Sequence, residues 1–301
     1  PDCAPTPVKE MHFFDVKHVS SMNGANFVGE FEDMAARAGQ LVGRVGKLRE
    51  RGVFDNIDYS LDPLHEKGVD DTLDRIIRAA QRLKVRDVSG YVDYMESWRR
   101  TSGAPVIGEI TPAYSILPRE GFAEIDSLYP EAKFIFILRD PVDRFLSIYY
   151  FWRSLYQREI ERTRATTLAI NYSLDDFASF FDDKGLIEAL YNRMTWQLAY
   201  SWEVDMRNDW RQQHKLNDLG VLELAKENLS KFKVVGFQER YSDVVEKLNG
   251  LYGINMANKE VNVTKSRERA HDISPETLAK IRSWLHLDVQ LYEYALTTFG
   301  Q

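Results

Sequence analysis

The residues of this 301-residue chain that are best suited to a chemical role lie where an apolar run meets a helix start. The run 133–138 is followed directly by Arg139, and a helix-start signal begins at Asp140. In open α/β sheets, ligands bind beyond the carboxyl ends of strands, and a helix N-terminus offers N–H groups and a positive dipole end to an anion. Arg139 adds a fork of donors suited to phosphate oxygens, and Ser147, two turns along the helix, adds a hydroxyl. The pattern predicts a phosphate-binding corner; the alternative is that Arg139 pairs with Asp140 or Asp143 and that Ser147 is a buried helix serine.

Three short apolar segments predict the strands that carry this corner. They are 105–110 (PVIGEI), 133–138 (KFIFIL) and 232–237 (FKVVGF). None alternates strictly between apolar and polar residues, which is typical of strands covered by helices on both faces. Helical patterns lie between them, so we expect an α/β fold with a mostly parallel central sheet flanked by helices.

Capping signals locate two of the helices. Asp140 followed by Pro141 predicts one helix start, and Ser274 followed by Pro275 predicts another. The stretches 156–173 and 257–273 are polar and poorly periodic, so we expect loops or insertions there. No linker forces a division, and we expect a single domain over residues 1–301.

Composition excludes several classes of protein. The chain is 44% hydrophobic and 28% charged, which is typical of a globular protein. A net charge of −7 argues against holding nucleic acid by bulk electrostatics. The longest apolar runs are far too short to span a bilayer. Cys3 is the single cysteine and CxxC pairs are absent, which favours a reducing, cytoplasmic compartment and no metal site.

At this point the sequence resembles a known family. The string from Arg139 to Ser147 reads RDPxxRxxS, which is similar to the 3′-phosphate-binding motif of sulfotransferases that use 3′-phosphoadenosine 5′-phosphosulfate (PAPS). Residues 9–15 (KEMHFFD) resemble a segment of bacterial carbohydrate sulfotransferases and of the heparan sulfate glucosaminyl sulfotransferases. Residues 108–114 (GEITPAY) resemble their "EKSPAY" strand end. Weaker matches lie at 191–198 and 222–241.

The resemblance implies a P-loop-NTPase-like sulfotransferase fold, with one departure. Relatives open with a strand and a PKxGTT-type phosphate loop, and neither this string nor a G-x-x-x-x-G-K-[ST] loop occurs here. We therefore expect that a strand, a loop and a helix, roughly 25–40 residues in the size of a βα unit, precede Pro1 in the natural protein.

The resemblance also implies catalytic roles near the amino end. Glu10 matches the catalytic base of the heparan sulfate relatives. A carboxylate can take the acceptor proton if it lies within about 3 Å of the oxygen or nitrogen atom that bears this proton. His12 is the rival base because its ordinary pKa lies near neutrality. Lys9 is a candidate to contact the transferring group, with a solvated lysine as the alternative.

Binding roles are carried over with their alternatives left open. Lys265 and Arg267 lie in a polar loop like those that close over the cofactor phosphates in relatives; the alternative is a solvated basic run. Glu109 and Tyr114 are candidates for the acceptor site, with a structural ion pair equally open for Glu109. We expect Arg144 to shape its helix face.

The expected function is transfer of the sulfuryl group of PAPS to a hydroxyl or an amine of a carbohydrate or another small acceptor, without a metal, a nucleic acid or membrane insertion. Two alternatives stay open: a non-catalytic nucleotide- or glycan-binding module of the same fold, and a related nucleotide-dependent kinase. The oligomeric state and the acceptor are not indicated by the sequence.

Overall fold

The computed structural model describes residues 3–5, 14, 17, 87–157, 163–178, 190–200, 218–256 and 273–300. Two compact units divide the chain. The first comprises residues 1–121 with 205–209, and the second comprises residues 122–204 and 210–301. We describe each unit by itself.

A pair of parallel strands organises the first unit. β1 (Cys3–Pro5) pairs with β2 (Val106–Gly108), and α4 (Val88–Ser102) precedes β2. Asp87 caps the start of α4 by accepting the N–H of Gly90 at 2.7 Å. The chain then turns through the 3₁₀ helix η2 (Pro112–Ile116), and α5 (Arg119–Leu128) continues into the second unit.

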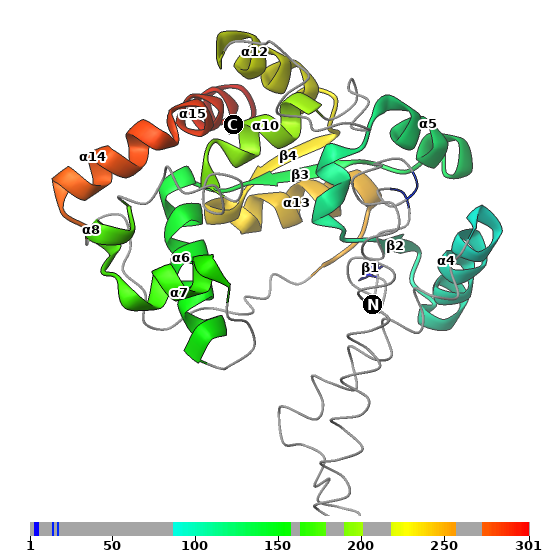
Figure 1. Cartoon of the computed structure of the whole chain (residues 1–301). Helices are drawn as coiled ribbons and strands as arrows, with labels where there is room; N and C mark the ends of the chain where they lie inside the picture. The colour runs from blue at the N-terminus through cyan, green and yellow to red at the C-terminus, as the bar shows by residue number, and fades with distance from the viewer. Residues whose placement is uncertain are drawn as a thin grey trace, which may run out of the picture. The chain divides into compact units, whose positions relative to one another are not determined.

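The second unit is built around another parallel pair, β3 (Ile135–Leu138) and β4 (Val234–Phe237). Leu138 lies opposite Phe237, so the two strands end side by side (Figure 1). All four residues of β4 are buried, whereas Ile135 and Ile137 of β3 are exposed. The burial expected on both faces therefore holds for β4 and not for β3.

Helices account for most of the second unit. In chain order they are α6 (Pro141–Gln157), α7 (Arg164–Asn171), α8 (Leu174–Phe177), α10 (Arg193–Tyr200), α12 (Asp218–Leu229), η3 (Gln238–Arg240), α13 (Tyr241–Tyr252), α14 (Pro275–Trp284) and α15 (His286–Phe299). Helices α13 and α15 both pack against β4, and α15 also contacts α6, α10, α12 and α14.

The observed elements confirm the α/β class. Each of the three predicted strands contains an observed strand, somewhat shorter than the prediction, and both described pairings are parallel. The described strands form two two-stranded sheets, so the single central sheet and the P-loop-like detail stay predictions. Residues 257–272, predicted to be a loop, lie outside the described residues.

The predicted loop at 156–173 is wrong over its second half, where α7 forms. Thr163 and Thr166 make a reciprocal capping box at its start. Thr166 and Ala169, three residues apart, are both fully buried on one face. A helix this short shows little periodicity in the sequence, so its capping and its burial against α6 decide the structure.

The core that supports α6 joins four helices. Its buried members come from α6, α7, α8 and α14, with Leu190 ahead of α10: Val142, Phe145, Leu146, Tyr149, Ala169, Leu174, Phe177, Ala178, Leu190, Ile281 and Leu285. Arg153 strengthens this packing by donating to the Tyr149 hydroxyl at 3.0 Å and to the Ala169 carbonyl at 2.6 Å. These bonds tie α6 to α7.

Candidate functional site

The carboxyl ends of β3 and β4 form one corner of the second unit, and Glu239 links them. The backbone N–H of Asp140, just after β3, donates to Glu239 Oε1 at 2.9 Å. The Tyr292 hydroxyl of α15 donates to Glu239 Oε2 at 2.9 Å. Burial, followed by this hydrogen bond to Glu239, raises the pKa of Tyr292, so its hydroxyl remains a donor. The corner therefore already contains the carboxylate of Glu239.

The first turn of α6 is capped by its own sequence. The Oδ1 atom of Asp140 accepts the N–H groups of Val142 at 2.9 Å and of Asp143 at 3.0 Å. Pro141 has no N–H to offer. The helix start predicted from Asp140 and Pro141 is confirmed. The sequence had suggested that the N–H groups of this helix start are free for an anion, but Asp140 already occupies those of Val142 and Asp143. Any anion at this corner depends more on side chains than on helix N–H groups.

Arg139 and Ser147 are the side chains predicted for that task. Both are half-buried, with Arg139 at the end of β3 and Ser147 within α6. Ser147 makes no side-chain hydrogen bond to any other described residue, so its hydroxyl is available. Asp140, Arg144 and Ser147 are spaced i, i+4 and i+7, which places them along one face of the helix. A guanidinium and a free hydroxyl near a strand end can bind phosphate oxygens.

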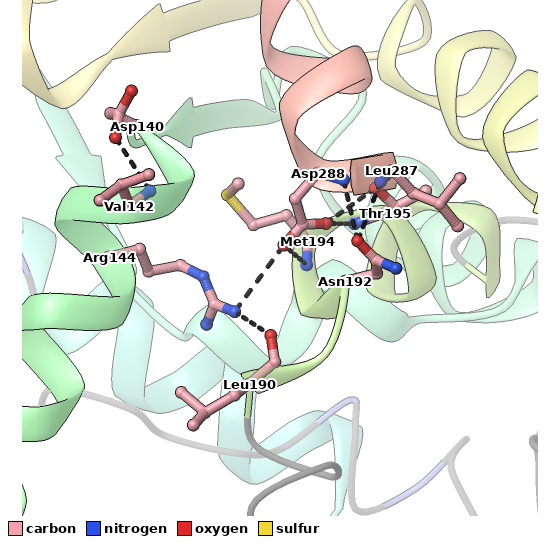
Figure 2. A network of polar contacts seen from close by, with 9 residues as sticks. All are labelled: Asp140, Val142, Arg144, Leu190, Asn192, Met194, Thr195, Leu287 and Asp288. Atoms are coloured by element: carbon pink, nitrogen blue, oxygen red, sulfur yellow. Dashed lines mark hydrogen bonds and ion pairs between the residues drawn. The ribbon is translucent and has the colours of Figure 1, made fainter. Parts of the chain in front are cut away.

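Arg144 is drawn away from solvent into the interior of the unit (Figure 2). Its Nη2 donates to the carbonyl of Leu190 at 3.0 Å and lies 3.8 Å from Oδ2 of Asp288 on α15. The side chain of Arg144, expected to shape its helix face, also joins α6 to two other segments. Burial lowers the pKa of Arg144, and the nearby Asp288 opposes that shift.

Asn192 and Asp288 cap each other's helices. The side-chain oxygen of Asn192, which immediately precedes α10, accepts the N–H groups of Leu287 at 3.0 Å and of Asp288 at 3.2 Å, in the first turn of α15. The carboxylate of Asp288 in turn accepts the N–H groups of Met194 at 3.3 Å and of Thr195 at 2.8 Å, in the first turn of α10. Asn192 has a φ of 44°, the left-handed conformation that asparagine tolerates better than most residues.

The acceptor-site candidates belong to the first unit. Glu109 accepts from the Tyr91 hydroxyl at 2.6 Å and from the Thr111 hydroxyl at 2.7 Å, one bond to each carboxylate oxygen. The Tyr114 hydroxyl accepts the N–H of Phe14 at 3.5 Å. The ring of Phe14 is fully buried, with edge contacts to the rings of Tyr91 and Tyr114. The structure thus brings Glu109 and Tyr114 into one polar and aromatic cluster.

The remaining predicted site residues lie outside the described residues: Lys9, Glu10, His12, Lys265 and Arg267. Phe14 is four residues beyond Glu10 in the sequence and is described.

Comparison with known proteins decides the family. A family model described as the sulfotransferase family matches residues 120–295, which is more than half of the chain. The chain belongs to the sulfotransferase family. Comparisons with curated proteins and with solved structures found no match. In this sulfotransferase-family chain the matched span contains the corner and its motif from Arg139 to Ser147, and begins after Glu109 and Tyr114.

Two further observations concern metal binding and membranes. Within the described ranges, no three His, Cys, Asp or Glu side chains gather as a metal site would require. None of the helices described here is both long enough and apolar enough to cross a bilayer.

Sequence reasoning missed three residues around the corner. Glu239 lies two residues after a predicted strand, so the rule that ligands bind beyond strand ends would have found it. Asp288 is an acidic residue near the start of α15, and Tyr292 follows it by one turn of that helix. Their spacing shows a common helix face, but their partners are distant in sequence.

Proposed function

We propose that this chain transfers the sulfuryl group of PAPS to a hydroxyl or an amine of a carbohydrate or another small acceptor. Membership of the sulfotransferase family supports sulfuryl transfer in general. The observation that carries the finer proposal is the position of Arg139: it follows β3 directly, beside the start of the helix that bears the unbonded hydroxyl of Ser147. A guanidinium and a hydroxyl at a strand end fit the ribose 3′-phosphate of PAPS.

The fit to a phosphate can be judged from the groups at the corner. Arg139 is a cation with several donors, and Ser147 offers a further one. The capping of α6 by Asp140 uses the N–H groups of Val142 and Asp143, so binding there relies on the two side chains. We assign Lys265 and Arg267 to the phosphates as well, on the resemblance stated above.

The reaction itself requires an in-line exchange at sulfur. A bond forms between the acceptor oxygen or nitrogen and the sulfur atom, and the bond from sulfur to the bridging oxygen of the phosphosulfate breaks. Adenosine 3′,5′-bisphosphate leaves with that bridging oxygen. The acceptor proton passes to the carboxylate of Glu10, with His12 as the rival base, and Lys9 offsets charge on the transferring group.

We propose that the acceptor binds at Glu109 and Tyr114. Their cluster of hydroxyl, carboxylate and aromatic groups matches what sugars require, namely hydrogen bonds to hydroxyls and stacking on rings. We propose that Glu109 orients an acceptor hydroxyl, exchanging one of its present hydroxyl partners for the substrate.

The decisive experiment is transfer of radioactive sulfate from labelled PAPS to a panel of sugars, lipids, phenols and peptides. We expect labelled product from at least one hydroxyl-bearing acceptor, and tighter calorimetric binding of adenosine 3′,5′-bisphosphate than of ATP. A preference for ATP would favour a kinase. Binding of adenosine 3′,5′-bisphosphate without transfer to any acceptor would favour a binding module.

A further inference from the structure

We propose that Asp288 and Arg144 are positioning residues for the phosphate corner: they fix α6 against α10 and α15 and thereby place Ser147 and Arg139. This inference rests on the function proposed above. Neither residue reaches the corner itself. Their role follows from how the helix that carries Ser147 is held.

Arg144 lies on the same face of α6 as Ser147. Arg144 precedes Ser147 by three residues, so the two lie on neighbouring turns of one helix face. Its guanidinium is bonded to the Leu190 carbonyl and faces Asp288 (Figure 2). Because a guanidinium makes directional bonds from a rigid plane, this contact fixes the rotation of α6 about its axis as well as its distance from α15.

Arg144 is attached to a rigid junction between α10 and α15. Asp288 is fully buried and accepts three bonds from the start of α10, from the N–H groups of Met194 and Thr195 and from the Thr195 hydroxyl. Asn192 returns two bonds to the start of α15. The reciprocal caps join the beginnings of two helices, so Arg144 is attached to a fixed junction and not to one mobile side chain.

A second contact of α15 with the corner supports the same role. Tyr292 lies four residues after Asp288, hence one turn further along the same face of α15. Its hydroxyl bonds to Glu239, which accepts the N–H of Asp140 at the start of α6. Helix α15 therefore holds α6 at two places, its first residue through Glu239 and its second turn through Arg144.

Stability alone is a poor explanation for this arrangement. Two charges taken out of water lose several kcal/mol of hydration each, and apolar residues of the same volume often stabilise a fold as well. Among the described residues, Arg144 Nε and Asn192 Nδ2 are buried without a hydrogen-bond partner, so the network does not satisfy all its own donors. Directional bonds that cost hydration are better explained by a need for a defined helix orientation.

The test compares two nucleotides that differ only in the 3′-phosphate. Calorimetry gives the dissociation constants of adenosine 3′,5′-bisphosphate and of adenosine 5′-monophosphate, and their ratio isolates what the 3′-phosphate contributes. For the wild-type chain we expect a ratio of about 10 to 150, the value of one bond to a charged group. Asp288→Asn should reduce this ratio at least fivefold, because α6 is released while Arg139 and Ser147 remain.

Two further variants complete the design. Arg144→Lys keeps the positive charge but loses the planar fork, and it should reduce the ratio in the same direction if Asp288→Asn fails to fold. Asn228→Ala is the matched control: Asn228 is equally buried and bonds to the carbonyls of Leu198 and Ala199 at the other end of α10. It should lower the melting temperature and leave the ratio at the wild-type value.

Each outcome has one interpretation. A reduced ratio in Asp288→Asn or Arg144→Lys, with an unchanged ratio in Asn228→Ala, supports the positioning role. Folded variants that keep the wild-type ratio reject it while leaving the proposed function intact. A wild-type chain that binds the two nucleotides equally rejects the phosphate corner, and with it both proposals.

Discussion

The backbone N–H of Asp140 and the carboxylate of Glu239 lie 2.9 Å apart, which joins the residues that follow two neighbouring parallel strands. The contact places a negative charge beside the residue that follows Arg139. It also holds the start of α6 against the end of β4. Glu239 therefore has two opposite effects on an anion at the corner: its geometry helps and its charge repels.

The two effects can be separated by Glu239→Gln. The amide oxygen can still accept the Asp140 N–H, but the negative charge is gone. Two like unit charges about 8 Å apart in water repel each other by about 0.5 kcal/mol. We therefore expect adenosine 3′,5′-bisphosphate to bind about twofold to fivefold more tightly, measured by calorimetry at low salt. The gain should shrink as salt is added.

Glu239→Ala and Tyr292→Phe serve as its controls. The alanine variant loses the charge and both hydrogen bonds, so its gain in affinity should be smaller than that of Glu239→Gln. Tyr292→Phe keeps the ring that contacts Phe237 and loses only the bond to Glu239. Weaker nucleotide binding in Glu239→Gln would mean that the carboxylate itself accepts a hydrogen bond from the nucleoside.

Arg139 should contribute most of the affinity for the 3′-phosphate. Arg139→Ala removes a charged donor, and bonds to charged groups are worth about 1.5–3 kcal/mol, which corresponds to a loss of roughly 10- to 150-fold in affinity. Arg139→Lys should recover part of it, because the charge remains while the fork is lost. Calorimetry with adenosine 5′-monophosphate, which lacks this phosphate, should show almost no change. An equal loss for both nucleotides would place Arg139 elsewhere on the ligand.

The fold could be predicted from sequence where local signals were strong. The strand β4 and the helix starts at Asp140 and Ser274 depend on neighbouring residues alone, and the structure has all three. Helix α7 was missed because its eight residues are stabilised by a capping box and by packing on α6. The exposure of Ile135 and Ile137 depends on which segments cover β3, which an apolar run does not reveal.

The candidate site, like the fold, could be predicted from the sequence only where local signals place its residues. Arg139 and Ser147 could be proposed from spacing, because one strand and one helix place them. The contacts around them come from residues about 50 to 150 positions away, such as Leu190 and Asp288 with Arg144. The expectation of free helix N–H groups was wrong, because the side chain of Asp140 itself occupies those of Val142 and Asp143. Capping residues and anion sites share one sequence signal, and only side-chain geometry separates them.

Glu10→Gln tests the proposed base. Glutamine keeps the size of the side chain but cannot take a proton, so we expect transfer of labelled sulfate to fall at least 100-fold, the lower end of general-base effects. The affinity for adenosine 3′,5′-bisphosphate should stay within twofold of wild type, since the phosphate ligands are untouched. His12→Gln is the matched variant for the rival base. Full turnover in Glu10→Gln with a loss in His12→Gln would reverse the assignment.

The packing of β4 against α13 gives a prediction about stability. A side chain added at Gly236 would collide with the side chain of Val244, which is almost fully buried in α13. We expect Gly236→Ala to lower the free energy of unfolding by about 1–3 kcal/mol, as overpacking usually does. Urea denaturation measures the change.

Gly108→Ala in β2 is the matched control for that substitution. An added methyl group there meets no atom of the described residues within 4 Å, so the unfolding free energy should change little. Val244→Ala should restore part of the stability of Gly236→Ala by making room. Equal losses at Gly108 and Gly236 would mean that the contact with α13 does not decide the loss.

The pH dependence of stability tests the burial of Asp288. Burial raises the pKa of this carboxyl above its usual value of 3.8, and Arg144 and the bonds from α10 only partly oppose the shift. Between 3.8 and the raised value, the folded protein holds a proton that the unfolded chain releases. The contribution of Asp288 to the unfolding free energy is therefore full below that range and is lost as the pH rises through it.

Asp288→Asn removes this titration, because asparagine stays neutral. The stability advantage of the wild-type chain over Asp288→Asn should consequently be largest at acid pH and shrink as the pH rises through the raised pKa, measured by urea denaturation over a range of pH. An advantage that instead grows with pH would show that the attraction of Arg144 outweighs burial and that the pKa of Asp288 lies below its usual value. The carboxylate would then be held charged by Arg144, and the same pair would contribute to stability as well as to the orientation of α6.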